Sequence, residues 1–201
     1  MGKVQNRSIN LDTRVMKRTY TWEDVESMCT DIVTQMHRQK WFPDYIVGIT
    51  RGGNVPATII SNMLDVRCEA LKVSLRDDSS LESNCWMACD AFGYVDESER
   101  ALVKTRWDIG RRKNILIVDD INDTGETLKW IKEDWEAGCL PNETGAWKSV
   151  WNNNVKFATL TDNLSSEMDV DFWADEVNKQ EQDVWLVYPW EVVGKLSARA
   201  D

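Results

Sequence analysis

The sequence predicts an α/β fold in which a mainly parallel, twisted sheet is flanked by helices. Residues 45–64 and 115–137 each have the pattern of a short apolar strand, a turn that contains glycine, and a helix. Two further apolar runs, 156–161 and 184–188, have the length and the β-branched or aromatic composition of strands. Strands that alternate with helices in this way are typical of parallel sheets covered by helices.

The first predicted helix spans residues 21–39, because apolar side chains recur there at helical spacing. Thr21 and Asp24 have the spacing of a capping box at its start. His37, the only histidine, lies near its end with no partner motif around it. We therefore expect His37 on the surface and not in a catalytic role.

The next elements follow in order along the chain. The strand at 45–50 stops at Arg51-Gly52-Gly53, and the apolar stretch 55–64 is predicted to be helical. A second strand is predicted at 69–75. Residues 76–113 then lose periodicity and become polar, which predicts a long active-site loop, because loops of that length are either functional or disordered.

The second strand, turn and helix unit has its strand at 115–120 and its helix at 125–137. Segments 138–153 and 162–182 read as connections, the latter strongly acidic. No repeat or low-complexity linker divides the chain, so residues 1–201 are predicted to form one domain.

Composition excludes several classes of protein. A net charge of −10 argues against binding to nucleic acid, which needs a basic surface. No apolar run has the length of a membrane span, and the N-terminal residues lack the apolar region of a secretory signal. The five cysteines are an odd number without framework spacing, which favours free thiols in a reducing compartment. We therefore expect a cytoplasmic protein with no membrane partner.

Two adjacent acids, Asp119 and Asp120, end the strand at 115–120. In a parallel sheet the ligand crevice lies at the carboxyl ends of the strands, so both carboxylates are expected there. Carboxylates accept hydrogen bonds from the vicinal hydroxyls of a ribose and bind Mg²⁺. The turn at 123–127 opens a helix, whose free N–H groups suit a phosphate. A site for a sugar phosphate with Mg²⁺ is therefore predicted.

Other settings also place two acids after an apolar strand. A Walker B strand needs a GxxxxGK[ST] loop, and the sequence has none. The chain after Asp120 is too short for the remainder of a receiver domain. Simple helix capping and solvation explains the acids but not the second glycine turn at Arg51-Gly52-Gly53, where a guanidinium lies beside residues that permit close backbone approach.

A basic segment, residues 100–113, carries a net charge of +5 in an otherwise acidic chain. It predicts a local attraction for anions, with a solvated charged segment as the alternative.

The thirteen residues ILIVDDINDTGET, 115–127, resemble the phosphoribosyl pyrophosphate signature of type I phosphoribosyltransferases. Segments 20–29, 48–60 and 183–191 resemble parts of the bacterial and archaeal xanthine-guanine enzymes of that family. About half of the chain is covered. The resemblance implies a parallel α/β sheet with a small hood formed by terminal segments. It also implies a homo-oligomer, dimer or tetramer.

The resemblance assigns roles to individual residues. Asp119 and Asp120 would contact the ribose hydroxyls and Mg²⁺, and Asp123 would carry a proton near N7 of a purine. Arg51, Gly52, Gly53 and Arg100 would bind pyrophosphate, with Arg100 also catalytic. Thr124, Gly125, Glu126 and Thr127 would hold the 5′-phosphate. Trp185 would stack on the base, and Leu186 would offer backbone groups to its edge.

The sequence departs from the family at one base contact. The xanthine-guanine and hypoxanthine-guanine enzymes present a lysine to the purine 6-oxo group after the strand that matches 156–161. Asp162 or Asn163 occupies that position here, and an ionised aspartate cannot donate a hydrogen bond. An amino-bearing base, a lysine arriving by another route such as Lys156, or a register shifted by one residue would each account for this.

The predicted reaction is transfer of the 5-phosphoribosyl group from phosphoribosyl pyrophosphate to a nucleobase, with pyrophosphate as the leaving group. The loop at 76–99 would close over the site as a lid that excludes water. Two rivals remain open. One is a non-catalytic sensor of phosphoribosyl pyrophosphate or a nucleotide on the same fold, and the other is an adenine or pyrimidine phosphoribosyltransferase.

Overall fold

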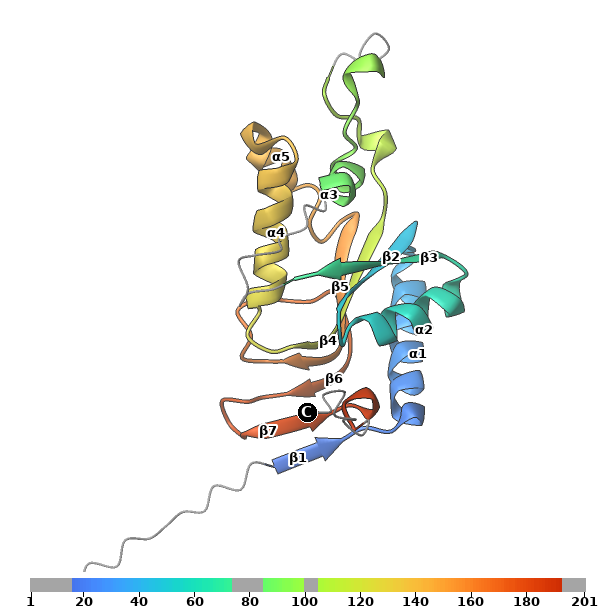
Figure 1. Cartoon of the computed structure of the whole chain (residues 1–201), viewed down its shortest axis with the longest axis vertical. Coiled ribbons are helices and arrows are strands. Elements are labelled where there is room, and N and C mark those ends of the chain that lie inside the picture. Colours follow the sequence, from blue (N-terminus) through green and yellow to red (C-terminus); the bar gives the residue numbers. More distant parts are fainter. Residues whose placement is uncertain (1–15, 74–84, 100–104, 193–201) are drawn as a thin grey trace, which may run out of the picture.

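The computed structural model describes residues 16–73, 85–99 and 105–192. A parallel five-stranded sheet with strand order β3-β2-β4-β5-β6 forms its centre (Figure 1). The strands are β2 (Tyr45–Thr50), β3 (Arg67–Lys72), β4 (Ile115–Asn122), β5 (Val155–Asn163) and β6 (Phe172–Val177). The prediction of a mainly parallel α/β sheet is confirmed.

Helices cover both faces of this sheet. Helices α1 (Trp22–Gln39) and α2 (Asn54–Leu64) lie on one face, and α3 (Cys85–Phe92), α4 (Glu126–Gly138) and α5 (Thr144–Trp147) lie on the other (Figure 1). Short 3₁₀ helices occur at Glu97–Glu99, Ile109–Arg111, Pro141–Glu143 and Pro189–Glu191. None of the helices within the described ranges is long and apolar enough to cross a membrane.

Strand β4 shows why its sequence is apolar throughout its first half. Ile115 and Ile117 pack in the core beneath α3 and α4, whereas Leu116 and Val118 pack in the core beneath α1 and α2. A central parallel strand is buried on both faces, so every residue until the first acid is apolar. The acids of the motif therefore begin where the strand leaves the core.

The local signals at the first helix are borne out by its contacts. The backbone N–H of Asp24 donates to Thr21 Oγ1 at 3.1 Å, and the backbone N–H of Thr21 donates to Asp24 Oδ2 at 2.8 Å. This is a complete capping box, and α1 begins at the next residue after Thr21. Strand β2 has the predicted bounds, and β3 begins and ends slightly earlier than predicted.

Several elements were not predicted, and three of them lie in segments that were expected to lack regular structure. Residues 76–113 were expected to lack regular structure, but α3 lies within them and buries Met87, Ala88, Ala91 and Phe92 against the core. The idea of one continuous lid at 76–99 is therefore wrong for residues 85–92, and residues 74–84 lie outside the described residues. Strand β6 lies within the acidic segment taken for a connection, and α5 lies within 138–153.

Two arginines of the basic segment have partners within the described residues. Arg111 forms an ion pair with Glu99, and Arg112 donates from Nη1 to the backbone oxygen of Ser149 at 2.9 Å. Both side chains lie before β4 begins, at the end of the sheet opposite the acids. Both side chains hold loops in place, and the attraction of residues 100–113 for anions stays a prediction.

A second, two-stranded sheet joins the two ends of the described chain. Strand β1 (Met16–Thr19) pairs in parallel with β7 (Val184–Val187), beside the β6 edge of the main sheet (Figure 1). The run at 184–188 therefore forms a strand, but in this sheet and not in the main one. Tyr20 and Tyr188 follow the two strands and stack on each other with ring centroids 5.0 Å apart. This pair of strands is the hood expected from the terminal segments.

Candidate active site

Asp119 and Asp120 lie at the carboxyl end of β4, as predicted. The backbone N–H of Asp120 donates to Asp119 Oδ1 at 2.9 Å, which fixes the first carboxylate. Burial, together with the negative charge of Asp120, raises the pKa of Asp119 well above its ordinary value. Burial also raises the pKa of Asp120. Two carboxyl groups held so close together in a poorly solvated place favour a bound cation.

The loop after β2 lies directly against these acids. A Cβ atom at residue 52 would be 1.8 Å from Asp120 Oδ2, and one at residue 53 would be 2.3 Å from the backbone oxygen of Val118. Only glycine permits this approach. Arg51, whose side chain is exposed, follows a cis peptide bond in the same loop. The glycine loop and the acidic pair, 66 residues or more apart in the sequence, therefore form one site.

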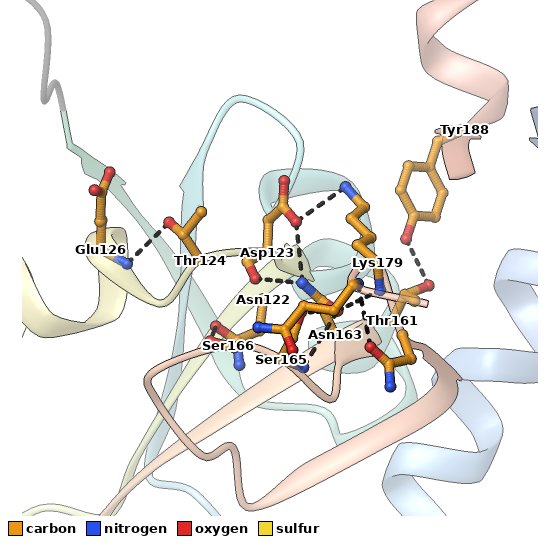
Figure 2. Close-up of polar contacts among 12 residues, drawn as sticks. Asn122, Asp123, Thr124, Glu126, Thr161, Asn163, Ser165, Ser166, Lys179 and Tyr188 are labelled. Atoms are coloured by element: carbon orange, nitrogen blue, oxygen red, sulfur yellow. Dashed lines mark hydrogen bonds and ion pairs between the residues drawn. The ribbon is translucent and has the colours of Figure 1, made fainter. Parts of the chain in front are cut away.

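The turn after β4 forms the wall of a cavity of about 180 Å³, which Asp119, Asp120, Asp123, Thr124, Gly125 and Thr127 help to line. Gly125 is the N-cap of α4 and has a φ of 86°, a conformation that glycine adopts readily. The backbone N–H of Glu126 lies 3.4 Å from Thr124 Oγ1 (Figure 2). N–H groups in the first turn of a helix have no acceptor within the helix, so this cavity suits a phosphate.

A second cavity of about 160 Å³ adjoins the first, because Asp120, Ile121 and Asp123 line both. Its other wall comes from the hood and includes Trp185, Leu186, Tyr188 and Glu191. The Trp185 side chain is 60% exposed, whereas Leu186 is buried. The Tyr188 hydroxyl lies 2.8 Å from Thr161 Oγ1 (Figure 2). It also lies 2.9 Å from the backbone oxygen of Asp120, and the two contacts join the hood to the sheet.

Asp123 contacts two residues that the sequence did not single out as partners. The side-chain amide of Asn163 donates to the backbone oxygen of Asp123 at 2.8 Å (Figure 2). The ammonium of Lys179 lies 2.9 Å from Asp123 Oδ1. Lys179 comes from the connection between β6 and β7, and it also lines the second cavity.

Comparisons with known proteins agree with this geometry. The family model described as "Phosphoribosyl transferase domain" matches residues 17–192. This chain belongs to the phosphoribosyltransferase family.

Two curated relatives carry the name xanthine-guanine phosphoribosyltransferase. The protein from Cereibacter sphaeroides is 31% identical over 147 residues, which are 73% of this chain and 68% of that protein. The protein from Desulfotalea psychrophila is 27% identical over 90% of this chain and 92% of its own length. The solved structure of a purine phosphoribosyltransferase from Pyrococcus horikoshii matches this chain with a TM-score of 0.57 at 21% sequence identity. The match covers 91% of this chain and 99% of that one, which shows that the two share a fold.

Strand β5 places Asp162 and Asn163, the two candidates for the position where the resemblance implied a base-binding lysine. Asp162 accepts a hydrogen bond from the side-chain amide of Asn122 at 2.8 Å and does not line the cavity beside Trp185. The adjacent Asn163 is the residue that turns toward Asp123. Lys156 lies at the opposite end of β5, where its ammonium contacts Gln39 Oε1 at 2.8 Å. The route through Lys156 is therefore wrong, and the geometry gives Asp162 no contact with a base in that cavity.

Arg100, predicted to contact pyrophosphate, lies outside the described residues. The structure brings together most of the other predicted residues, from Gly52 and Gly53 to the 119–127 segment and Trp185. Sequence reasoning missed Lys179 and the positioning amide of Asn163. A lysine inside an otherwise acidic connection was the signal that could have drawn attention to Lys179.

Proposed function

We propose that this phosphoribosyltransferase transfers the 5-phosphoribosyl group of phosphoribosyl pyrophosphate to a purine base and releases pyrophosphate. The observation that carries the proposal is the pair of adjoining cavities that share Asp120, Ile121 and Asp123. One cavity suits the sugar phosphate and the other an aromatic base. The reacting ribose carbon then lies at their boundary, where the new bond to the base forms as pyrophosphate leaves.

The donor half of the site uses three groups of residues. Thr124, Gly125, Glu126 and Thr127 hold the 5′-phosphate, largely through backbone N–H groups at the start of α4. Asp119 and Asp120 accept hydrogen bonds from the ribose hydroxyls. Gly52 and Gly53 bring the loop close to these acids, so that Arg51 and backbone N–H groups face the pyrophosphate. Arg100 is proposed to join them.

The residues present fit a requirement for Mg²⁺. Both acids carry oxygen ligands. Burial raises their pKa values, and a bound positive charge would favour the ionised carboxylates that bind it. In the described part of the chain, no group of three or more His, Cys, Asp or Glu side chains is placed to hold a metal by itself. Mg²⁺ is commonly held by one or two carboxylates and substrate phosphates. When bound, Mg²⁺ supplies charge that stabilises the departing pyrophosphate.

The acceptor half of the site uses the hood and Asp123. Trp185 presents an exposed ring to the cavity, and its indole stacks on the base. Asp123 accepts the proton that the base loses when its other nitrogen attacks the ribose carbon. The ribose carries positive charge in the transition state, and the carboxylates of Asp119 and Asp120 stabilise that charge.

The test measures pyrophosphate release when the protein, Mg²⁺ and phosphoribosyl pyrophosphate are mixed with hypoxanthine, guanine, xanthine, adenine, uracil or orotate. We expect release with purines. Binding of the donor without release for any base would instead favour the non-catalytic sensor, and release with only uracil or orotate would favour the pyrimidine enzyme.

Asp123→Asn separates catalysis from binding. We expect this variant to lose turnover and to bind phosphoribosyl pyrophosphate as the unmodified protein does. Asp65→Asn, at an exposed residue after α2, is the matched control and should retain both properties. Full turnover by Asp123→Asn would contradict the role assigned to Asp123.

The oligomeric state and the cellular location of the enzyme are part of the same proposal. We expect a homo-oligomer, which light scattering of the purified protein measures directly, and the exposed apolar side chains of Trp22 and Met63 support it. We also place the enzyme in the cytoplasm, because its five cysteines are free.

A further inference from the structure

Lys179 enters the acceptor cavity from a direction that the sequence did not predict. It lies in the connection after β6, and its side chain reaches back to the carboxyl end of β4, where its Nζ atom is 2.9 Å from Asp123 Oδ1 (Figure 2). Its side chain is 26% exposed, so it is neither buried in the core nor fully solvated. It lines the same cavity as Trp185 and Leu186.

A single buried amide fixes the two partners of this ion pair. Asn163, which is only 5% exposed, donates from Nδ2 to the backbone oxygen of Asp123 at 2.8 Å. Its Oδ1 accepts from the backbone N–H of Lys179 at 3.0 Å (Figure 2). Both main chains are therefore held to the end of β5. The pair has a defined geometry, in contrast to an ordinary surface ion pair between two mobile side chains.

Lys179 is surrounded by acidic side chains in the lining of the cavity. Asp120, Asp123 and Glu191 contribute carboxyl groups to the lining, and Lys179 is the one cation among the described residues there. An ammonium has three N–H donors, and Asp123 Oδ1 takes one of them. Donors are thus left for an acceptor on a bound base.

We propose that Lys179 and Asp123 together recognise the N7 and O6 edge of a 6-oxopurine. Lys179 donates a hydrogen bond to O6, and Asp123 accepts one from the proton on N7. This inference rests on the proposed function and makes it specific. It assigns the 6-oxo contact, which sequence alignment placed at Asp162 or Asn163, to a residue of a different connection, with Asn163 as the residue that positions the pair.

The complementarity follows from the chemistry of the two edges. A donor and an acceptor lie side by side on the protein, and a 6-oxopurine protonated at N7 presents an acceptor beside a donor. A 6-aminopurine presents an amino group in place of the oxo group. An ammonium cannot accept a hydrogen bond from that amino group, so adenine is disfavoured.

The experiment compares Lys179→Met with Lys156→Met. Methionine keeps much of the length of the side chain but has no N–H donor, and Lys156 lies outside the site at the far end of β5. In Lys179→Met we expect kcat/KM for hypoxanthine and guanine to fall by about 10- to 100-fold, the range for loss of a hydrogen bond from a charged donor. The affinity for phosphoribosyl pyrophosphate and the activity of Lys156→Met should stay unchanged.

Binding of product nucleotides gives a second measurement that needs no turnover. Calorimetry should show that Lys179→Met weakens binding of GMP, which has O6, much more than binding of AMP, which has an amino group. If no base supports turnover in the unmodified protein, the proposed function fails, and the GMP and AMP comparison still decides the role of Lys179. Unchanged GMP affinity in Lys179→Met, equal losses for GMP and AMP, or no GMP binding by the unmodified protein would overturn the inference.

Discussion

Gly52 lies so close to Asp120 that a Cβ atom at residue 52 would be 1.8 Å from the Oδ2 atom of the carboxylate. The contact joins the loop after β2 to the end of β4, which are the two halves of the donor site. No side chain fits between them without moving either the loop or the acid.

The substitution Gly52→Ala tests this contact. We expect the free energy of unfolding to fall by about 1–3 kcal/mol through overpacking, and the affinity for phosphoribosyl pyrophosphate to fall as well. Denaturation in urea and calorimetric titration measure the two effects. Gly138→Ala is the matched control, because nothing lies within 4 Å of its added Cβ atom. That variant should gain up to about 1 kcal/mol from helix propensity. Unchanged donor affinity in Gly52→Ala would contradict the close approach.

The buried amide of Asn163 gives a second prediction. Asn163→Ala leaves the backbone oxygen of Asp123 and the backbone N–H of Lys179 without their partner. We expect a loss of about 1–3 kcal/mol in unfolding free energy, the usual penalty for unpaired buried groups. Because the residue positions the acceptor side, KM for the base should rise while donor affinity is retained.

The control for Asn163 is Asn153→Ala, which removes an exposed amide that bonds the backbone oxygen of Ser149. It should leave stability and kinetics nearly unchanged. Equal behaviour of the two variants in base KM would show that Asn163 does not position the acceptor site.

We predict that Trp185 contributes to binding of the base and little to the stability of the fold. Its side chain is 60% exposed, so Trp185→Ala removes little buried area. Loss of stacking, worth about 1 kcal/mol beyond area burial, should raise KM for the base several-fold. Trp22→Ala removes a similarly exposed indole, 54%, outside the acceptor cavity and is the control in steady-state kinetics. A base KM that is the same in both variants would argue against stacking.

The raised pKa of Tyr20 leads to a prediction of how the stability of the protein depends on pH in the alkaline range. Its hydroxyl donates to Asp175 Oδ2 at 2.6 Å, and burial with that hydrogen bond raises its pKa from 10.0 to about 12. Because the pKa is higher in the folded state, the neutral hydroxyl contributes stability that is complete below pH 10.0 and is lost toward about pH 12. Urea midpoints should therefore fall across this range.

Tyr20→Phe provides the comparison for that measurement. It should be less stable than the unmodified protein at neutral pH, because Asp175 loses a donor, and its urea midpoint should fall less steeply between pH 10.0 and about 12. An equally steep decline in both proteins would assign the effect to other groups.

The elements that the sequence predicted well are those with local signals. Helix α1 has apolar residues at helical spacing and a capping box whose two residues, Thr21 and Asp24, are only three positions apart. Strand β4 is apolar until it leaves the core, and the glycine at 125 marks the start of α4. Strand β6 lacks such a signal, because only Phe172 and Val177 are buried and acidic residues lie between them. At an edge of the sheet, pairing with β5 outweighs weak strand propensity.

The donor site was predictable for the same reason, since its acids and phosphate turn are contiguous in the chain. In the acceptor site Trp185, Leu186 and Asp123 were predicted from the resemblance, but Lys179 was not, because it reaches the cavity through contacts between residues far apart in sequence. Its place depends on the length of the connection after β6 and on a backbone hydrogen bond to Asn163, 16 residues earlier. The resemblance compares positions along the chain, so it pointed to Asp162 or Asn163 and passed over a lysine from another segment.

The pairing of β1 with β7 has a consequence for the growing polypeptide. During synthesis the first strand leaves the ribosome long before the segment 184–187 that it pairs with. The central strands and the phosphate turn precede β7 in the chain, so they are available to fold earlier. The wall that faces the base is therefore assembled last, and a chain truncated before β7 lacks that wall.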